Sequence, residues 1–354
     1  MAETEVQLRT SDFEYDLPRE LIAQVPAELR GADRMLLVRR RGGSAEHQDL
    51  AFGDFPSLIE PGDVLVVNTT RVRHARLVGR RASGAKAEVL LIHPGSDGTW
   101  IALGKPGAAL RPGRRIELGG GAGIETLELL EGGYRRVRVV GATAEEAMAR
   151  FGRLPLPPYI EREPTPEDED RYQTVYAARE GSVAAPTAGL HFTPEILAGI
   201  EARGGLVEGL ELEVGPGTFK PVDEEDYARH PMPAERFEIP EAAAAAVAMA
   251  RDRASSVWAI GTTVVRALES AATREGGVRA GPGETRLLIT PGYGFRVVNR
   301  LLTNFHLPRS SLLLLVAAFA GHPAAMEAYR HAVRARYRFY SYGDAMAVIG
   351  VRGQ

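Results

Sequence analysis

Short apolar runs alternate along the chain with longer stretches in which apolar residues recur at helical spacing. Residues 35–38, 64–67, 206–214 and 257–260 are rich in β-prone apolar side chains and predict buried strands. Helices are predicted over 18–24, 194–202, 241–254, 263–271, 312–320 and 323–337, and two more strands over 287–289 and 295–298. Alternation of this kind is typical of a mixed α/β domain.

The pattern changes between residues 76 and 140. Short β-prone stretches cover 87–92, 100–103, 115–118 and 134–140, with glycine and proline between them, and predict a small antiparallel β-barrel or sandwich. The proline-rich segment 154–160 and the acidic residues 161–170 read as a stiff connector, with a polyproline ligand as the alternative. We therefore predict a mixed α/β main domain over 1–72 and 153–354, with a small antiparallel β-barrel domain inserted over 73–152.

Composition excludes several classes of protein. The chain has 354 residues, 44% of them hydrophobic and 25% charged, as in globular proteins of about two or three domains. It has no cysteine, which excludes disulfides, thiolate-bound metals and cysteine nucleophiles. The longest apolar run, 312–320, falls short of the ~20 residues of a membrane-spanning helix, and the N-terminus lacks a secretory signal. We expect a cytoplasmic protein that does not enter a membrane.

The net charge of -3 argues against a protein that coats nucleic acid. Arginines nevertheless cluster within 30–41, 71–81 and 111–138. A folded chain could gather some of them into a phosphate-binding patch. The alternative is a general preference for arginine over lysine, because the chain has only three lysines, Lys86, Lys105 and Lys220. Both interpretations stay open.

Polar residues suited to chemistry are densest over 170–194. Small residues there let the backbone approach a ligand, Ser182 and Thr187 offer hydroxyls, and His191 offers an imidazole suited to proton transfer near neutral pH. Thr193 and Pro194 have the residue types of a helix N-cap and first helical position. The alternative for His191 is a structural histidine in a tight turn.

Three other segments are candidates for ligand contact. The glycine-rich turn 214–219 lacks both the dinucleotide fingerprint and the P-loop lysine, and 260–263 is a strand-to-helix turn whose N–H groups could hold a carboxylate or a ribose hydroxyl. Residues 304–308 and 337–344 bring aromatic rings, His306 and Asp344 together, which suits a cationic ligand or simple core packing. The chain has no nucleophile-elbow motif and no recognisable metal-ligand spacing, so we predict no metal site.

Taken in order, these blocks resemble the S-adenosylmethionine:tRNA ribosyltransferase-isomerase family of queuosine biosynthesis. The resemblance runs from Asp-Phe-Glu-Tyr-Asp-Leu-Pro at 12–18 to Ser-Tyr-Gly-Asp-Ala-Met at 341–346, and includes 21–24, 67–72, 154–160, 171–176, 184–193, 261–263, 291–293 and 303–308. It implies transfer and isomerisation of the ribosyl unit of S-adenosylmethionine onto a 7-aminomethyl-7-deazaguanine base in the tRNA anticodon loop, giving epoxyqueuosine, adenine and methionine. It also implies an α/β domain with an inserted β-barrel, no cofactor besides the co-substrate, and a monomer or homodimer.

The resemblance, together with the local chemistry, nominates the site residues. His191, His306 and Glu213 are the predicted catalytic residues, for proton transfer. Arg266 is predicted to bind the methionine carboxylate through its planar fork. The other predicted substrate-binding residues are Asn68, Arg71, Tyr172, Tyr176, Ser182, Pro186, Thr187, Gly215, Gly217, Phe219, Glu235, Thr262, Thr263, Asn304, Tyr342 and Asp344.

Several positions depart from the family's usual motifs. Glu213 and Pro233 stand where histidines are usual, Thr69 replaces a common Asp or Asn, and Val264 and Val265 replace small polar residues. Loss of two imidazoles changes the groups that can carry protons. The alternative function is therefore a diverged enzyme that consumes S-adenosylmethionine with a small-molecule acceptor, or cleaves it without tRNA. A non-catalytic RNA-binding protein is the third hypothesis.

Overall fold

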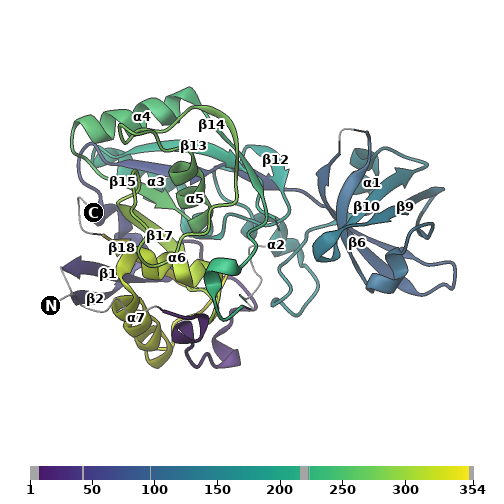
Figure 1. Ribbon diagram of the computed structural model, residues 1–354, viewed down its shortest axis with the longest axis horizontal. Helices are drawn as coiled ribbons and strands as arrows, with labels where there is room; N and C mark the ends of the chain where they lie inside the picture. Colours follow the sequence, from purple (N-terminus) through teal and green to yellow (C-terminus); the bar gives the residue numbers. More distant parts are fainter. Residues whose placement is uncertain (1–7, 42–43, 96, 216–221, 223, 351–354) are drawn as a thin grey trace.

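The structure is a computed structural model that describes residues 8–41, 44–95, 97–215, 222 and 224–350, and its fold is mixed α/β (Figure 1). The main body is built on a nine-stranded sheet with the order β16-β14-β13-β3-β15-β17-β18-β1-β2. Its strands are β1 (Arg34–Arg41), β2 (Ser44–Ala51), β3 (Val64–Asn68), β13 (Leu206–Leu212), β14 (Glu235–Ile239), β15 (Val257–Ile260), β16 (Gly281–Thr285), β17 (Arg300–Asn304) and β18 (Ala345–Ile349). The four strands β13, β3, β15 and β17 run parallel to one another.

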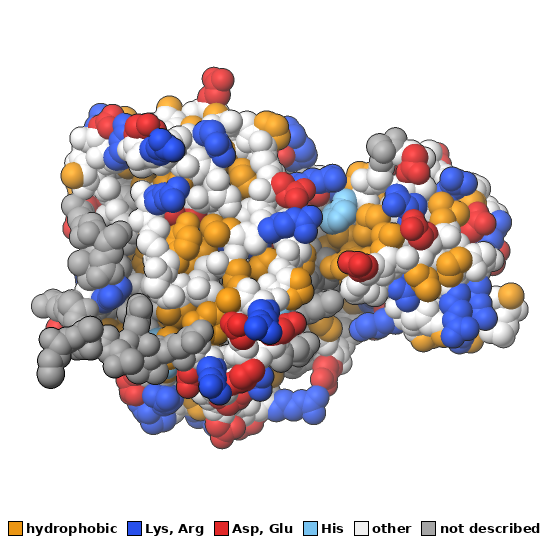
Figure 2. Space-filling view, viewed as in Figure 1, with side chains coloured by type: hydrophobic (Ala, Val, Ile, Leu, Met, Phe, Trp, Pro, Cys, Tyr) orange, Lys and Arg blue, Asp and Glu red, His pale blue; other side chains and the backbone are white. Residues whose placement is uncertain are grey.

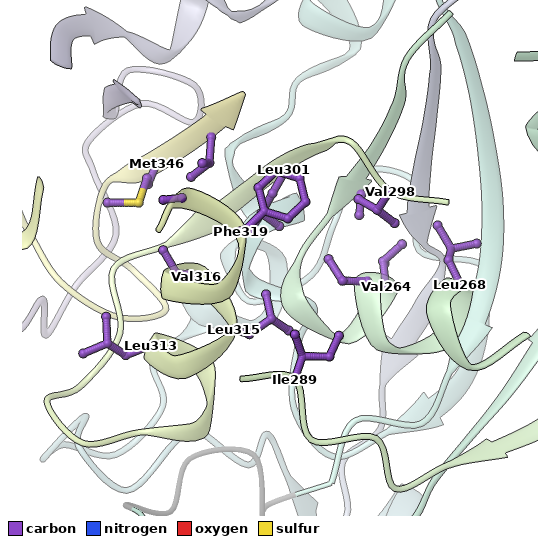
Figure 3. Packing of buried hydrophobic residues seen from close by; sticks show 14 of the residues in the cluster. Val264, Leu268, Ile289, Val298, Leu301, Leu313, Leu315, Val316, Phe319 and Met346 are labelled. Carbon is purple, nitrogen blue, oxygen red and sulfur yellow. The ribbon is translucent and has the colours of Figure 1, made fainter. Parts of the chain in front are cut away.

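Helices cover both faces of this sheet because its strands alternate between two hydrophobic clusters. Leu36 and Val38 of β1 face the cluster that contains the buried sides of α4 (Glu241–Asp252), α5 (Thr262–Ala271), α6 (Ser311–Ala320) and α7 (His322–Arg334). Met35 and Leu37 face the other cluster, with α3 (Pro194–Ala202) and the 3-10 helix Phe52–Leu58. Figure 3 shows Phe319 of α6 close to Leu301 of β17, with Val264 and Leu268 of α5 near Val298 in the same cluster.

Local sequence explains where several helices begin and end. Thr193 caps α3 by accepting from the backbone N–H of Ile196, and Pro194 occupies the first turn, as expected. Helix α6 is apolar on nearly all sides and ends at Gly321, whose φ of +88° turns the chain into α7. Within the described ranges, no single helix is both long and apolar enough to cross a membrane; α6 and α7 meet that criterion as a pair, but they are bent by 116°.

A second, antiparallel sheet has the order β11-β5-β6-β7-β10-β9-β8, with an extra pairing between β5 and β8. Its strands are β5 (Arg76–Arg80), β6 (Lys86–Pro94), β7 (Trp100–Lys105), β8 (Arg115–Gly119), β9 (Ala122–Leu129), β10 (Arg135–Val140) and β11 (Gly152–Arg153), and helix α1 (Ala144–Phe151) packs against it. The four strands expected between residues 76 and 140 are confirmed. Figure 1 shows this sheet to one side of the main body.

The chain passes between the two bodies through a small parallel ladder. Strand β4 (Thr70–Val72) leads out of the main body, and α2 (Pro166–Arg171) and β12 (Arg179–Ser182) lead back. β12 pairs in parallel with β4. Helix α2 lies inside the acidic segment that we predicted as a plain connector, where the backbone N–H of Thr165 donates to Asp168 and Pro166 occupies the first turn.

Some predicted elements are wrong. Residues 18–24 contain only the 3-10 turn Arg19–Leu21, and neither 287–289 nor 295–298 is a strand. The buried carboxylate of Glu269 on α5 explains the second case, because it accepts hydrogen bonds from the backbone N–H groups of Arg296 (2.9 Å), Val297 (3.0 Å) and Val298 (2.9 Å). Those donors are therefore not available to a neighbouring strand. The strand in this region is β17, which we had not predicted.

Candidate active site

A cavity lies at the carboxyl ends of three parallel strands, the usual position of ligand sites in open α/β sheets. Val214 follows β13, Gly261 follows β15, and Asn304 ends β17. Six predicted site residues line the cavity: Pro186, Thr187, Thr262, Thr263, Asn304 and His306. Segments far apart in the sequence are thus brought together, as the motifs suggested.

One wall of this cavity is the first turn of α5. Gly261 has a φ of +102°, a conformation that glycine adopts without strain, and the helix starts directly after it. Thr262 and Thr263 both line the cavity and are more than nine-tenths buried. The positive end of the helix dipole and its free N–H groups favour an anionic or hydroxyl-bearing ligand group.

His306, which follows β17, also lines the cavity. Its Nε2 is 2.8 Å from Thr303 Oγ1, its backbone N–H donates to the Tyr329 hydroxyl at 3.1 Å, and its carbonyl accepts from the Tyr15 hydroxyl. Burial lowers the pKa of His306 to about 3. The imidazole is therefore neutral near pH 7, so it can exchange hydrogen bonds with a ligand but holds a proton only weakly.

His191 reaches the cavity indirectly, through Asn304. Its Nδ1 lies 2.8 Å from Asp33 Oδ2, and its Nε2 lies 3.1 Å from Asn304 Nδ2. The ring is buried against Phe52, with the ring centroids 5.0 Å apart. Both ring nitrogens are therefore engaged by protein groups, which does not favour His191 as the residue that exchanges protons with the ligand. Its catalytic role stays a prediction.

A second hollow lies between the seven-stranded sheet and the main body, where Figure 2 shows apolar side chains gathered at the junction. It is lined by His93 and Tyr134 from one body and by Gly215, Glu235 and Arg266 from the other. Arg266 is buried there: it is paired with the Glu235 carboxylate and donates through Nε to the Leu287 carbonyl at 2.9 Å. Its Nη2 is buried and has no hydrogen-bond partner among the described residues.

Comparison with known proteins shows the family to which the chain belongs. A family model described as "Queuosine biosynthesis protein" matches residues 10–348. The chain belongs to this queuosine biosynthesis family. The S-adenosylmethionine:tRNA ribosyltransferase-isomerase of Anaeromyxobacter sp. (strain Fw109-5) is 50% identical over 346 residues, which cover 96% of this chain and 98% of the relative. The protein of the same name from Syntrophomonas wolfei is 49% identical over 345 residues, which cover 96% and 97%.

A solved structure agrees with this assignment. The crystal structure of an S-adenosylmethionine tRNA ribosyltransferase from Thermotoga maritima aligns with a TM-score of 0.54 and 34% identity, covering 96% of this chain and 100% of that one. The resemblance inferred from the sequence motifs is thereby confirmed.

The departures from the usual motifs of the queuosine biosynthesis family lie outside the Asn304 cavity. Val264 and Val265 are fully buried in the main hydrophobic cluster, and Pro233 lines the second hollow. Glu213 lines a third hollow, with its Oε2 3.9 Å from Nδ1 of His93. Thr69 donates from its hydroxyl to the Leu210 carbonyl at 3.1 Å. None of these five side chains lines the cavity that holds His306.

Two predicted ligand contacts instead hold the end of β13. The amide of Asn68 donates to the Leu212 carbonyl at 3.0 Å and accepts from the Thr70 and Leu212 backbone N–H groups. Ser182 is fully buried; its hydroxyl contacts Thr70 Oγ1 at 2.8 Å and accepts from the Val214 backbone N–H at 3.0 Å. Their hydrogen-bonding groups are used inside the protein, so a binding role for them stays a prediction.

Other predicted contacts tie segments of the family fold together. The Asp344 carboxylate accepts from the backbone N–H groups of Arg34 (2.9 Å) and Arg338 (2.7 Å), and the Tyr342 hydroxyl donates to Asp168 at 2.6 Å. Arg71 is exposed and donates to the Ala177 carbonyl at 3.0 Å.

Four of the predicted substrate-binding residues remain to be located in the structure. Tyr172 is fully buried in a small cluster, and the Tyr176 ring packs near Phe192, with the ring centroids 6.2 Å apart. Gly217 and Phe219 lie outside the described residues.

Sequence reasoning missed Asp33 and Thr303. Asp33 precedes β1 in a turn whose composition gives no sign of a site, and it becomes significant only when the fold sets it against His191. Thr303 lies within the 303–308 motif, two residues before an apolar aromatic, and could have been nominated from its position there.

Proposed function

We propose that this protein transfers and isomerises the ribosyl unit of S-adenosylmethionine onto the 7-aminomethyl-7-deazaguanine base of a tRNA anticodon loop, with release of adenine and methionine. The observation that carries the proposal is 50% identity, over nearly the full length of both chains, to a relative named for that activity. The cavity at the ends of β13, β15 and β17 supports the proposal, because hydroxyl, amide and imidazole groups line it. We also propose that the protein acts in the cytoplasm. We expect it to be a monomer or a homodimer.

Different residues of the two hollows have different roles in this reaction. The first turn of α5, with Thr262 and Thr263, holds ribose hydroxyls or a carboxylate at its N–H groups. His306, which is neutral and buried, exchanges hydrogen bonds with the ribose or the adenine, and its part in proton transfer stays a prediction. Arg266 in the second hollow takes the methionine carboxylate through its unpaired Nη2. No cofactor besides S-adenosylmethionine takes part.

The direct test is incubation of the purified protein with S-adenosylmethionine, with and without tRNA that carries the aminomethyl-deazaguanine base. We expect adenine and methionine, measured by mass spectrometry, to appear only with that tRNA, together with a tRNA mass increase for the transferred ribosyl unit. Release without tRNA would replace the proposal with the diverged enzyme that cleaves S-adenosylmethionine alone. Binding of tRNA without any release would favour an RNA-binding protein.

We also propose that residues 73–152 form an inserted domain whose sheet closes as a small barrel through the β5–β8 pairing, and that this domain binds tRNA phosphates. It has its own hydrophobic cluster. It holds 13 Lys and Arg against 8 Asp and Glu, a net charge of +5, whereas the remaining residues carry -8 of the total of -3. Figure 2 shows several Lys and Arg side chains together at the lower edge of this body. Charge of this sign, concentrated on one part of the chain, favours RNA phosphates.

Charge reversal tests that assignment. Arg80 and Lys86 are direct partners in the β5–β6 register, Lys105 lies on the adjoining strand, and all three are exposed. The triple variant R80E/K86E/K105E should raise the KM for tRNA about tenfold or more at low salt, with the KM for S-adenosylmethionine unchanged, because phosphate contacts are lost. The matched control R253E/R274E/R286E changes three exposed arginines of the main body. Equal effects of the two triple variants would refute a localised tRNA surface.

A further inference from the structure

The amide of Asn304 has a fixed orientation. Its Nδ2 lies 3.1 Å from the Tyr340 carbonyl oxygen, which can only accept, so this atom must be the nitrogen of the amide. The same nitrogen lies 3.1 Å from Nε2 of His191. Both N–H bonds of Asn304 are thus directed at protein acceptors.

The orientation of Asn304 determines the tautomer of His191. Because Nε2 of His191 faces an N–H donor, that ring nitrogen must carry a lone pair, and the ring proton must sit on Nδ1. Nδ1 then donates to Asp33 Oδ2 at 2.8 Å. Asp33, His191 and Asn304 are all at least nine-tenths buried, so water does not compete effectively for these bonds.

The remaining polar atom of the Asn304 side chain has no such partner. Oδ1 of Asn304 is buried and has no hydrogen-bond partner among the residues that the structure describes, although Asn304 lines the cavity. Buried acceptors are nearly always satisfied, because an unmet one loses its hydration without compensation. The unmet acceptor therefore points to a ligand that brings a donor.

We infer that Asp33 and His191 are positioning residues that hold Oδ1 of Asn304 ready to accept a hydrogen bond from an uncharged N–H or O–H donor of S-adenosylmethionine. The donor is either the adenine amino group or a ribose hydroxyl. This inference rests on the proposed function, and it adds a specificity contact to the cavity. His191 acts here through Asn304 and exchanges no proton with the substrate.

The hydrogen bonds that link Asp33 to His191 and His191 to Asn304 predict the effect of a substitution at Asp33. An amide at position 33 can turn its NH2 group toward Nδ1 of His191, which moves the ring proton to Nε2. The Nε2–H of His191 then faces an N–H of Asn304, because the Tyr340 carbonyl keeps Nδ2 on that side. The two donors repel each other and displace the Asn304 amide, so Oδ1 is no longer held to accept from a ligand donor.

The test measures binding of unreactive probes by calorimetry. S-adenosylhomocysteine is compared with its inosine counterpart, in which a carbonyl replaces the adenine amino group, and with its 2′-deoxy and 3′-deoxy counterparts. The wild-type protein should bind one of these altered probes about tenfold or more weakly than S-adenosylhomocysteine, and the altered group identifies the donor. Asp33→Asn should reduce that ratio toward one. The matched control is Asp252→Asn. Asp252 is exposed and pairs with Arg251, so this substitution should leave the ratio unchanged.

A second pair of variants separates positioning from simple structural damage. His191→Gln can still present an oxygen to Asn304 Nδ2 and should keep most of the discrimination, whereas His191→Leu cannot and should lose it. Equal affinity of the wild-type protein for all four probes would overturn the inference while the proposed function stands. Failure of S-adenosylhomocysteine to bind at all would instead count against the proposed function.

Discussion

Replacing Glu269 by Gln should lower the free energy of unfolding by about 3 kcal/mol or more. The Glu269 carboxylate is buried and accepts from three successive backbone N–H groups, those of Arg296, Val297 and Val298. An amide keeps one oxygen, but its NH2 group must face at least one of these donors. The NH2 group of the glutamine and the backbone N–H that it faces are then two buried donors without an acceptor. Burial of unsatisfied polar groups is among the most destabilising effects of a single substitution.

Urea unfolding followed by circular dichroism at pH 7 measures this effect. The matched control is Glu201→Gln on α3, where the side chain is exposed and a change within about 0.5 kcal/mol is expected. If both variants unfold at the same urea concentration as the wild-type protein, the carboxylate does not hold the 296–298 segment as described.

The stability of the wild-type protein should fall steeply in acid, with a large share of the loss due to His306. Burial lowers the pKa of His306 to about 3, against an ordinary value near 6.5 in the unfolded chain. Between these two values the unfolded chain binds a proton that the folded protein does not. The contribution is therefore fully present above pH 6.5 and is lost as the pH falls toward 3, by about 5 kcal/mol in all.

Other groups also destabilise the fold in acid, so a comparison with His306→Gln isolates this contribution. Asp168 is one such group: burial alone would raise its pKa, but hydrogen bonds from Arg162, Thr165 and Tyr342 outweigh burial and lower it. The wild-type and His306→Gln proteins share that carboxylate. Their unfolding free energies should differ at pH 7 and converge as the pH falls. Parallel curves from pH 7 to pH 4 would show that His306 is not buried in its neutral form.

The sequence predicted those elements whose pattern repeats locally. The helices 194–202 and 312–320 and the strand 257–260 show their periodicity and caps directly in the sequence, and the structure has α3, α6 and β15 at nearly the same bounds. Helix α1 was missed although Thr143 and Glu146 form a capping box, so that signal was present and unused.

Other elements depend on tertiary contacts that no local pattern reveals. In strand β14 the inward-facing positions include Glu235, which is buried and paired with Arg266. The sequence of this strand therefore lacks the alternation of apolar and polar residues that predicts a strand. Strand β2 is mostly polar and forms only because it pairs with β1 along its whole length. In the site, the motifs identified Asn304 and His306, but the link from Asn304 to Asp33 joins residues 271 positions apart and could be seen only in the fold.

The pairing of β3 with β13 has a consequence for how the chain folds. Val66 lies opposite Glu208, so about 140 residues must form a loop before these two strands can meet. The seven-stranded sheet falls inside that loop, and its strands pair mostly with near neighbours in the sequence. If it folds first, it shortens the flexible part of the loop to about half, which lowers the entropy cost of closure by about 0.6 kcal/mol. We therefore expect the inserted segment to become protected from amide hydrogen exchange earlier in refolding than β3 and β13, because local contacts form faster than distant ones.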